Sequence, residues 1–201
     1  TSALPDEDMV KSQYRRYGNL VYGIDTFRGL FNDRQLFVLG SLCEAVRAAH
    51  AAMLDDGMGP ERAKAVATYL GLCVDRIADY DCTFTSLVPG GEFHAHLFKR
   101  QAVSMVWDYV EVQPLLDVSG SWSGAVRWIE LALDHVSMAG EEPAACLRAS
   151  AQDLPLDDHS IDAVIVDPPY YDAIQYGDLS DFFYVWLKRS IGHLYPAVFS
   201  T

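Results

Sequence analysis

The stretch Ile161–Tyr170, IDAVIVDPPY, is the most informative part of this sequence. The run Ala163–Val166 is apolar and mostly β-branched, which is typical of a strand that is covered on both faces in a parallel sheet. Asp167 follows it, so a carboxylate is expected at the carboxyl end of a buried strand, where ligands bind in open α/β sheets. Pro168 and Pro169 then fix the backbone, because proline locks φ and has no N–H. The sequence therefore predicts a rigid, acid-bearing turn as the place to look for chemistry.

The composition is that of an ordinary intracellular protein. The chain has 201 residues, half of them hydrophobic, which is enough for one sizeable domain or for a piece of a larger one. No run approaches a membrane span and no signal peptide is recognisable, so we expect no membrane association and a cytoplasmic location. The four cysteines lack close paired spacing and are expected to be reduced thiols. The formal charge of −13 argues against a general nucleic-acid coat but leaves room for a local basic surface.

Helical periodicity dominates much of the chain, and capping residues mark where the helices begin. Asn32 or Asp33 is expected to cap the first helix, and Pro60 suits the first turn of the second. Asp178 is expected to be the N-cap of the last. Residues 93–111 stay ambiguous between strand and helix. The helices that we expect lie over residues 34–54, 60–79, 123–138 and 178–191.

The residues around Asp167 suit one kind of chemistry. An exocyclic amine on an aromatic base is a poor nucleophile, because its lone pair is delocalised into the ring. Hydrogen bonds from the amine to the Asp167 carboxylate and to the Pro168 carbonyl would localise that pair, and the prolines would hold both acceptors still. Tyr170 or Tyr171 can stack on the base, a contact worth ~1–3 kcal/mol in single-stranded nucleic-acid sites. This combination favours attack of an amine on a methyl donor.

The tetrapeptide Asp167–Tyr170 resembles the signature of amino-methyltransferases that act on adenine N6 or cytosine N4 with S-adenosylmethionine (SAM). The wider run Ser150–Arg189 is similar to large adenine-specific DNA methylases that also carry a zinc-ribbon insertion. Some of these are encoded beside anti-phage defence genes. The similarity extends upstream through residues 30–36, 75–79 and 98–111, and so covers most of the chain.

This resemblance implies roles for individual residues. Asp167, Pro168 and Tyr170 would hold the target base, Pro169 would set the turn, and these four would form the catalytic site. Tyr171 would be a second stacking ring. From the residues themselves we expect no metal site in this chain, because its cysteines lack the spacing of a zinc site. The residues that the resemblance places beside SAM are Ser150, Ala151, Asp153 and Asp167.

The chain also departs from that family. The family binds SAM chiefly through a glycine-rich Phe-x-Gly-x-Gly loop, and neither this loop nor the zinc-ribbon cysteines occur here. We therefore expect an α/β fold that is part of a Rossmann-like class I SAM methyltransferase sheet, preceded by a mainly helical region. Residues 1–140 would be a helical insertion or target-recognition region, and residues 141–201 a partial core. The rest of the methyltransferase, with its SAM loop, would lie outside this chain.

The expected function is SAM-dependent methylation of an exocyclic amine in DNA, with adenine N6 favoured and cytosine N4 as the other target. This chain would supply the base-binding half. Two alternatives stay open. One is an RNA guanine amino-methyltransferase, and the other is a non-catalytic nucleic-acid-binding or scaffold fragment that has lost SAM binding.

Three further patterns have ordinary structural explanations beside the functional ones. His94 and His96 could be two metal ligands on one strand face, but no third ligand is near them in the sequence. Trp107 and Tyr109 could contact substrate, yet burial of both rings is expected equally. The pair Lys99-Arg100 could touch phosphates, whereas isolated basic pairs are usually solvated surface.

Overall fold

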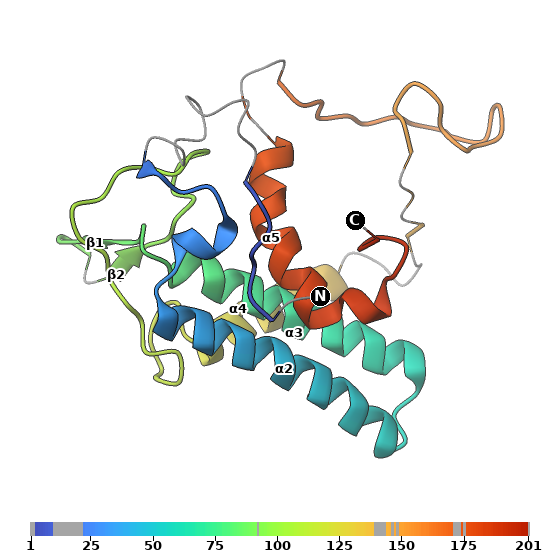
Figure 1. Cartoon of the computed structure of the whole chain (residues 1–201). Helices are drawn as coiled ribbons and strands as arrows, with labels where there is room; N and C mark the ends of the chain where they lie inside the picture. Colours follow the sequence, from blue (N-terminus) through green and yellow to red (C-terminus); the bar gives the residue numbers. More distant parts are fainter. Residues whose placement is uncertain are drawn as a thin grey trace.

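A computed structural model describes residues 3–9, 22–91, 93–138, 144–145, 147, 149–170, 174 and 176–200. The part of the chain that it describes is mostly helical, with one small antiparallel sheet (Figure 1). The α-helices are α2 (Asp33–Asp55), α3 (Pro60–Tyr80), α4 (Trp122–Ser137) and α5 (Tyr176–Ile191). Short 3₁₀ segments are η2 (Phe27–Leu30) and η3 (Gly192–Leu194), and the strands are β1 (Ser86–Val88) and β2 (Phe93–Ala95).

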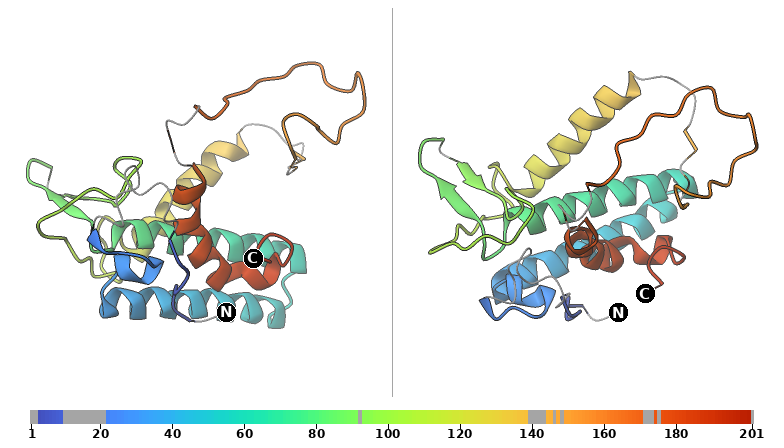
Figure 2. Two further views of the ribbon diagram at one scale, coloured as in Figure 1. Left: turned by 45° about the horizontal axis from the view of Figure 1, so that its top comes forward. Right: turned by 90° about the horizontal axis from the view of Figure 1, so that it is seen from above.

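Helices α2 and α3 form a hairpin that lies along one side of the molecule (Figure 2). A capping box starts α2: the Gln35 N–H donates to Asn32 Oδ1 and the Asn32 N–H donates to Gln35 Oε1, each at 2.9 Å. Asn32, rather than Asp33, is thus the N-cap. Pro60 is the first residue of α3. The two helices that periodicity predicts over 34–54 and 60–79 are confirmed.

Helix α2 is also the one helix, within the ranges described above, whose length and composition would allow it to cross a membrane. Its apolar stripe is not free for lipid, because it packs into the core of the helical bundle. The hydrophobic residues of α2 that are buried there are Leu36, Leu39, Cys43 and Val46. This packing favours a core helix, and the cytoplasmic location stays a prediction.

Helix α5 packs against both α2 and α3, and its aromatic residues fill the centre of the core. Phe182 and Trp186 are fully buried. The Phe31 ring stacks on Phe182 with centroids 5.9 Å apart and meets Trp186 edge-on at 5.3 Å. Burying a large ring stabilises the fold by about 1.5–3 kcal/mol, so these residues fix where α5 lies.

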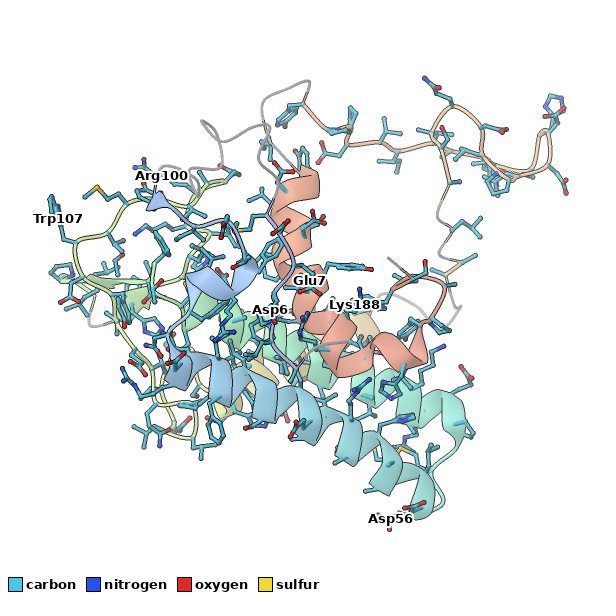
Figure 3. The ribbon with its side chains drawn as sticks, in the orientation of Figure 1. Asp6, Glu7, Asp56, Arg100, Trp107 and Lys188 are labelled. Atoms are coloured by element: carbon cyan, nitrogen blue, oxygen red, sulfur yellow. The ribbon has the colours of Figure 1, made fainter. Side chains whose placement is uncertain are left out.

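A buried cation ties the amino-terminal segment to α5. Arg189 is only 5% exposed, and its guanidinium binds the Glu7 carboxylate through two hydrogen bonds of 3.0 and 2.8 Å. It also donates to the Val185 carbonyl at 2.7 Å and to the Leu4 carbonyl. Figure 3 shows Glu7 beside α5. A bidentate pair of this kind offsets the cost of burying the charge and holds the two segments in one geometry.

The strand predicted over residues 161–166 is absent, and the expected Rossmann-like sheet is wrong for the described structure. Residues 161–170 have no secondary structure and are exposed throughout, with Ile165 96% exposed. The one sheet in the described residues pairs β1 with β2, with Ser86 opposite Ala95. A β-branched run becomes a buried strand only where neighbouring strands and covering helices are present, and the described residues do not bring them to residues 161–166.

Two helix boundaries sharpen the sequence prediction. Ser121 is the N-cap of α4, and the Gly124 N–H donates to its Oγ at 3.2 Å. Helix α5 begins at Tyr176, two residues earlier than expected, so Asp178 lies in the first turn and its prediction as the N-cap is wrong. The carboxylate still lies at the positive end of the helix dipole, where a negative charge stabilises the helix.

The hairpin of β1 and β2 folds back on the end of α3. Tyr80 lies between two histidines, with His94 edge-on at 5.4 Å and His96 stacked at 5.2 Å. Gly120 packs against the other side of His94: its φ is +82°, and a Cβ there would lie 2.8 Å from His94 Nε2. Both the backbone angle and the space at this position therefore require glycine.

Replacement of Gly120 by alanine should destabilise the protein through two effects. The left-handed conformation costs a non-glycine residue roughly 1–2 kcal/mol, and the overlap with His94 should add about 1–3 kcal/mol. Gly57→Ala is the matched control, because φ is +84° there and nothing lies within 4 Å of an added Cβ. Urea unfolding measures both. Equal losses of stability in the two variants would show that the His94 contact is unimportant.

Asp75 is a charged residue buried inside the helical core. It is 5% exposed, and its Oδ1 has no hydrogen-bond partner among the described residues. Burial raises the pKa of the Asp75 carboxyl well above its usual range. The protonated form is therefore favoured in the folded state.

Asp75→Asn should stabilise the protein in a pH-dependent way. The folded pKa lies above the unfolded value of about 3.9, so the unfolded chain releases its proton first as the pH rises, and the stability of the wild type falls. The variant carries no such group and should be more stable at neutral pH, by on the order of 1–3 kcal/mol. Urea unfolding at several pH values should show this gap closing as the pH falls towards about 4. A gap that stays constant with pH would contradict this account.

Candidate functional site

A cavity of about 460 Å³ lies between the segment 167–170 and the first residue of α5. Its lining residues are Asp167, Pro168, Pro169, Tyr170 and Tyr176. The tyrosine side chains are accessible, with Tyr170 64% and Tyr176 48% exposed. The complete Asp-Pro-Pro-Tyr motif thus faces one cavity, although not at the end of a strand as expected.

Tyr176 is the member of this site that sequence reasoning missed. It lies at the amino end of α5, and the packing of Phe182 and Trp186 fixes that helix in the core. Because the helix was predicted to begin at residue 178, Tyr176 was not recognised as part of its exposed first turn beside the motif. The expected second stacking residue, Tyr171, lies outside the described residues.

The chemistry of the lining is specific. It offers one carboxylate, the carbonyls of two prolines that have no N–H to donate, and two phenol rings. None of the five lining residues is a lysine or an arginine. A phosphate or carboxylate ligand would therefore meet acceptors without compensating charge, whereas a flat ring with an amino group would find acceptors and stacking partners.

Of the four residues expected beside SAM, Asp167 lines the cavity and the other three lie apart from it. Ser150 and Asp153 close a short turn, in which the Asp153 N–H donates to the Ser150 carbonyl at 3.1 Å. The whole turn, with Ala151, is exposed and does not line the cavity of Asp167. This arrangement does not form a cradle that would hold SAM against Asp167, so the cofactor stays a prediction.

A polar cluster at the start of α2 is explained by the fold. Arg34 forms two hydrogen bonds of 2.8 and 2.7 Å to Glu111, and Asn32 Nδ2 donates to Glu111 and to Tyr109 at 3.1 Å each. The hydrogen bond from Arg34 lowers the pKa of Glu111. Beneath them Asp81 accepts from Gln35 Nε2 at 3.2 Å. These contacts fasten the segment around Tyr109 to α2, and their polar groups already have partners.

His94 of β2 and His96 just after it are likewise engaged in structure. His96 Nδ1 lies 2.8 Å from Asp79 Oδ2, and His94 is buried between Tyr80 and Gly120. Burial lowers the pKa of His94, which favours its neutral ring. Within the part of the chain that the structure covers, no group of three or more potential ligands could hold a metal ion.

The comparisons with known proteins leave the site to be interpreted on its own chemistry. No protein-family model matches the chain, and no match was found among curated proteins or among solved structures.

Proposed function

We propose that this chain holds the target base in SAM-dependent methylation of an exocyclic amine in DNA, with adenine N6 favoured and cytosine N4 as the other substrate. One observation carries the proposal: the Asp-Pro-Pro-Tyr motif and Tyr176 together line one accessible cavity, and its described lining residues offer acceptors and aromatic rings but no cation. The resemblance of the motif to amino-methyltransferases supports the same reading.

The proposed roles follow from hydrogen-bonding capacity. The Asp167 carboxylate and the Pro168 carbonyl accept hydrogen bonds from the two N–H groups of the amine, which draws its nitrogen out of conjugation with the ring. Pro168 and Pro169 keep these acceptors from rearranging. Tyr170 and Tyr176 stack on the base after it has left the helix. Asp167 need not remove a proton before the reaction, because the amine can lose it after becoming cationic.

In this proposal SAM supplies the methyl group and is bound mainly by residues outside this chain. The absence of a Phe-x-Gly-x-Gly loop from this sequence supports the proposal that other residues bind SAM. DNA as the substrate also fits a cytoplasmic protein with reduced thiols. Cys43, Cys73 and Cys82 are free and buried, and burial raises the pKa of the Cys43 thiol to about 12, so that thiol stays protonated and unreactive.

The direct test is methyl transfer by the full-length protein from labelled SAM to duplex DNA, with RNA offered in parallel. Asp167→Ala should lower transfer to DNA by about two to three orders of magnitude, as loss of one preorganised polar group does at other active sites. Asp162→Ala is the matched control, because Asp162 is exposed in the same segment but does not line the cavity. That variant should keep the wild-type rate.

Each other outcome points to a definite alternative. Transfer to RNA alone would replace DNA with RNA as the substrate. Undiminished transfer by Asp167→Ala would remove Asp167 from the site. No transfer to either nucleic acid by the wild-type protein would favour a non-catalytic binding or scaffold role.

A further inference from the structure

A second surface, outside the Asp167 cavity, carries an exposed ring with no structural role. Trp107 is 94% exposed, and Met105 beside it is 56% exposed. They belong to residues 97–108, which we call the Trp107 loop. Figure 3 shows Trp107 and Arg100 at the end of the molecule that carries β1 and β2. Burial of Trp107, which the sequence made equally probable, does not occur. Exposure of this ring forgoes hydrophobic free energy that stacking on a flat ligand would recover.

The backbone of the loop is fixed, although the Trp107 side chain extends into solvent. The N–H groups of Leu97 and Phe98 donate to the Asp79 carbonyl at 2.9 Å and to its carboxylate at 3.1 Å. Val103 is buried in the core, so the middle of the loop is held as well. Just beyond the loop, the Val110 N–H donates to Thr85 Oγ1 at 3.1 Å. The backbone that carries Trp107 is therefore held in place between these contacts, which lowers the entropy cost of binding.

The charge of this loop differs from that of the whole chain. Residues 97–108 contain Lys99 and Arg100 and one acid, Asp108, which gives the loop a formal charge of +1 in a chain of formal charge −13. Both cations are exposed, and Lys99 uses one of its three donors on Ser86 Oγ at 2.7 Å. An exposed ring and two accessible cations on one loop match a strand of nucleic acid, which offers a base to the ring and phosphates to the cations.

The loop and the Asp167 cavity are both fixed by α5. The Phe98 ring meets Phe182 and Phe183 of α5 at 5.0 and 5.7 Å, whereas Tyr176 at the start of the same helix lines the cavity. Seven residues separate Tyr176 from Phe183, a rise of roughly 10 Å at 1.5 Å per residue. One helix therefore supports both the cavity and the base of the loop.

We propose that the Trp107 loop binds DNA, with Trp107 stacked on an unpaired base and Lys99 and Arg100 on phosphates of the same strand. The choice of DNA rests on the proposed function, whereas the surface itself stands on the exposure and charge of the loop. Stacking requires an open base face, so the preferred ligand is single-stranded DNA or duplex DNA opened by removal of a base.

The test measures binding of the full-length protein by fluorescence anisotropy. The ligands are a short, labelled, single-stranded oligodeoxynucleotide of mixed sequence and the same sequence as RNA. Trp107→Ala should weaken binding to DNA by about 5-fold to 150-fold, the range for one lost base–aromatic stack. Lys99→Ala combined with Arg100→Ala should lower the slope of log affinity against log salt by about 1.4, because each phosphate contact on a single strand contributes about 0.7.

Exposed side chains of α2 and α3 outside the loop provide matched controls. Phe37→Ala removes a ring that is 75% exposed on α2, and Arg62→Ala removes an exposed cation of α3. Neither should change the affinity or the salt slope. Trp107 makes no core contacts, so thermal unfolding should show that its variant keeps the wild-type stability.

The results separate this proposal from the proposed function. Wild-type affinity in Trp107→Ala, or tighter binding of the RNA than of the DNA, would overturn the assignment of the loop. Weakened DNA binding in Trp107→Ala, in a wild-type protein that transfers no methyl group, would uphold the loop and overturn the methylation proposal alone.

Discussion

The packing of α5 into the α2–α3 hairpin is the interaction on which both proposed surfaces depend. Trp186 and Phe182 fill the space between the helices, and Ile191 approaches the backbone of α3 at Gly71, where a Cβ would lie 3.1 Å from its side chain. The amino end of this helix bears Tyr176, which lines the Asp167 cavity, and its middle bears Phe183, which contacts the Trp107 loop. One helix in the core thus sets the positions of two exposed sites.

Polar side chains at the edge of the core fasten the loops that the helices alone would leave free. Asp79 accepts the Phe98 N–H and pairs with His96, and Arg189 binds Glu7 and two backbone carbonyls. Thr85 donates to the Val110 carbonyl at 2.6 Å. Groups of this kind cost free energy when buried alone, so their hydrogen bonds make the native arrangement of the loops more favourable than alternatives.

The sequence predicted the helices well because their signals are local. Asn32, Pro60 and Ser121 are short-range capping signals, and helical periodicity reports the buried face without reference to other segments. The strand over 161–166 failed because strand formation depends on neighbouring strands, which lie elsewhere in sequence. Its apolar composition shows a preference for burial, but composition does not specify a partner.

The sites were predictable only in part for the same reason. The Asp-Pro-Pro-Tyr tetrapeptide has its functional groups in four adjacent residues, so a shared cavity could be expected. The position of Tyr176 at that cavity depends on where α5 begins. Helix starts are uncertain by a residue or two from sequence. The exposure of Trp107 could not be predicted from the sequence either, because a tryptophan among valines is as typical of a core as of a surface.

The described structure is a helical scaffold that presents two aromatic surfaces of different charge. The Asp167 cavity has acceptors for an amine, and the Trp107 loop has cations for phosphates. Together they would hold a displaced base at one surface and its strand at the other.

The most direct test of the central claim is the modified-nucleoside content of DNA from cells that produce the full-length protein, measured by mass spectrometry. The account predicts a methylated exocyclic amine, N6-methyladenine above all, that is absent when Asp167 is replaced by alanine. DNA without such a base, or with an equal amount of it in the variant, would contradict the account.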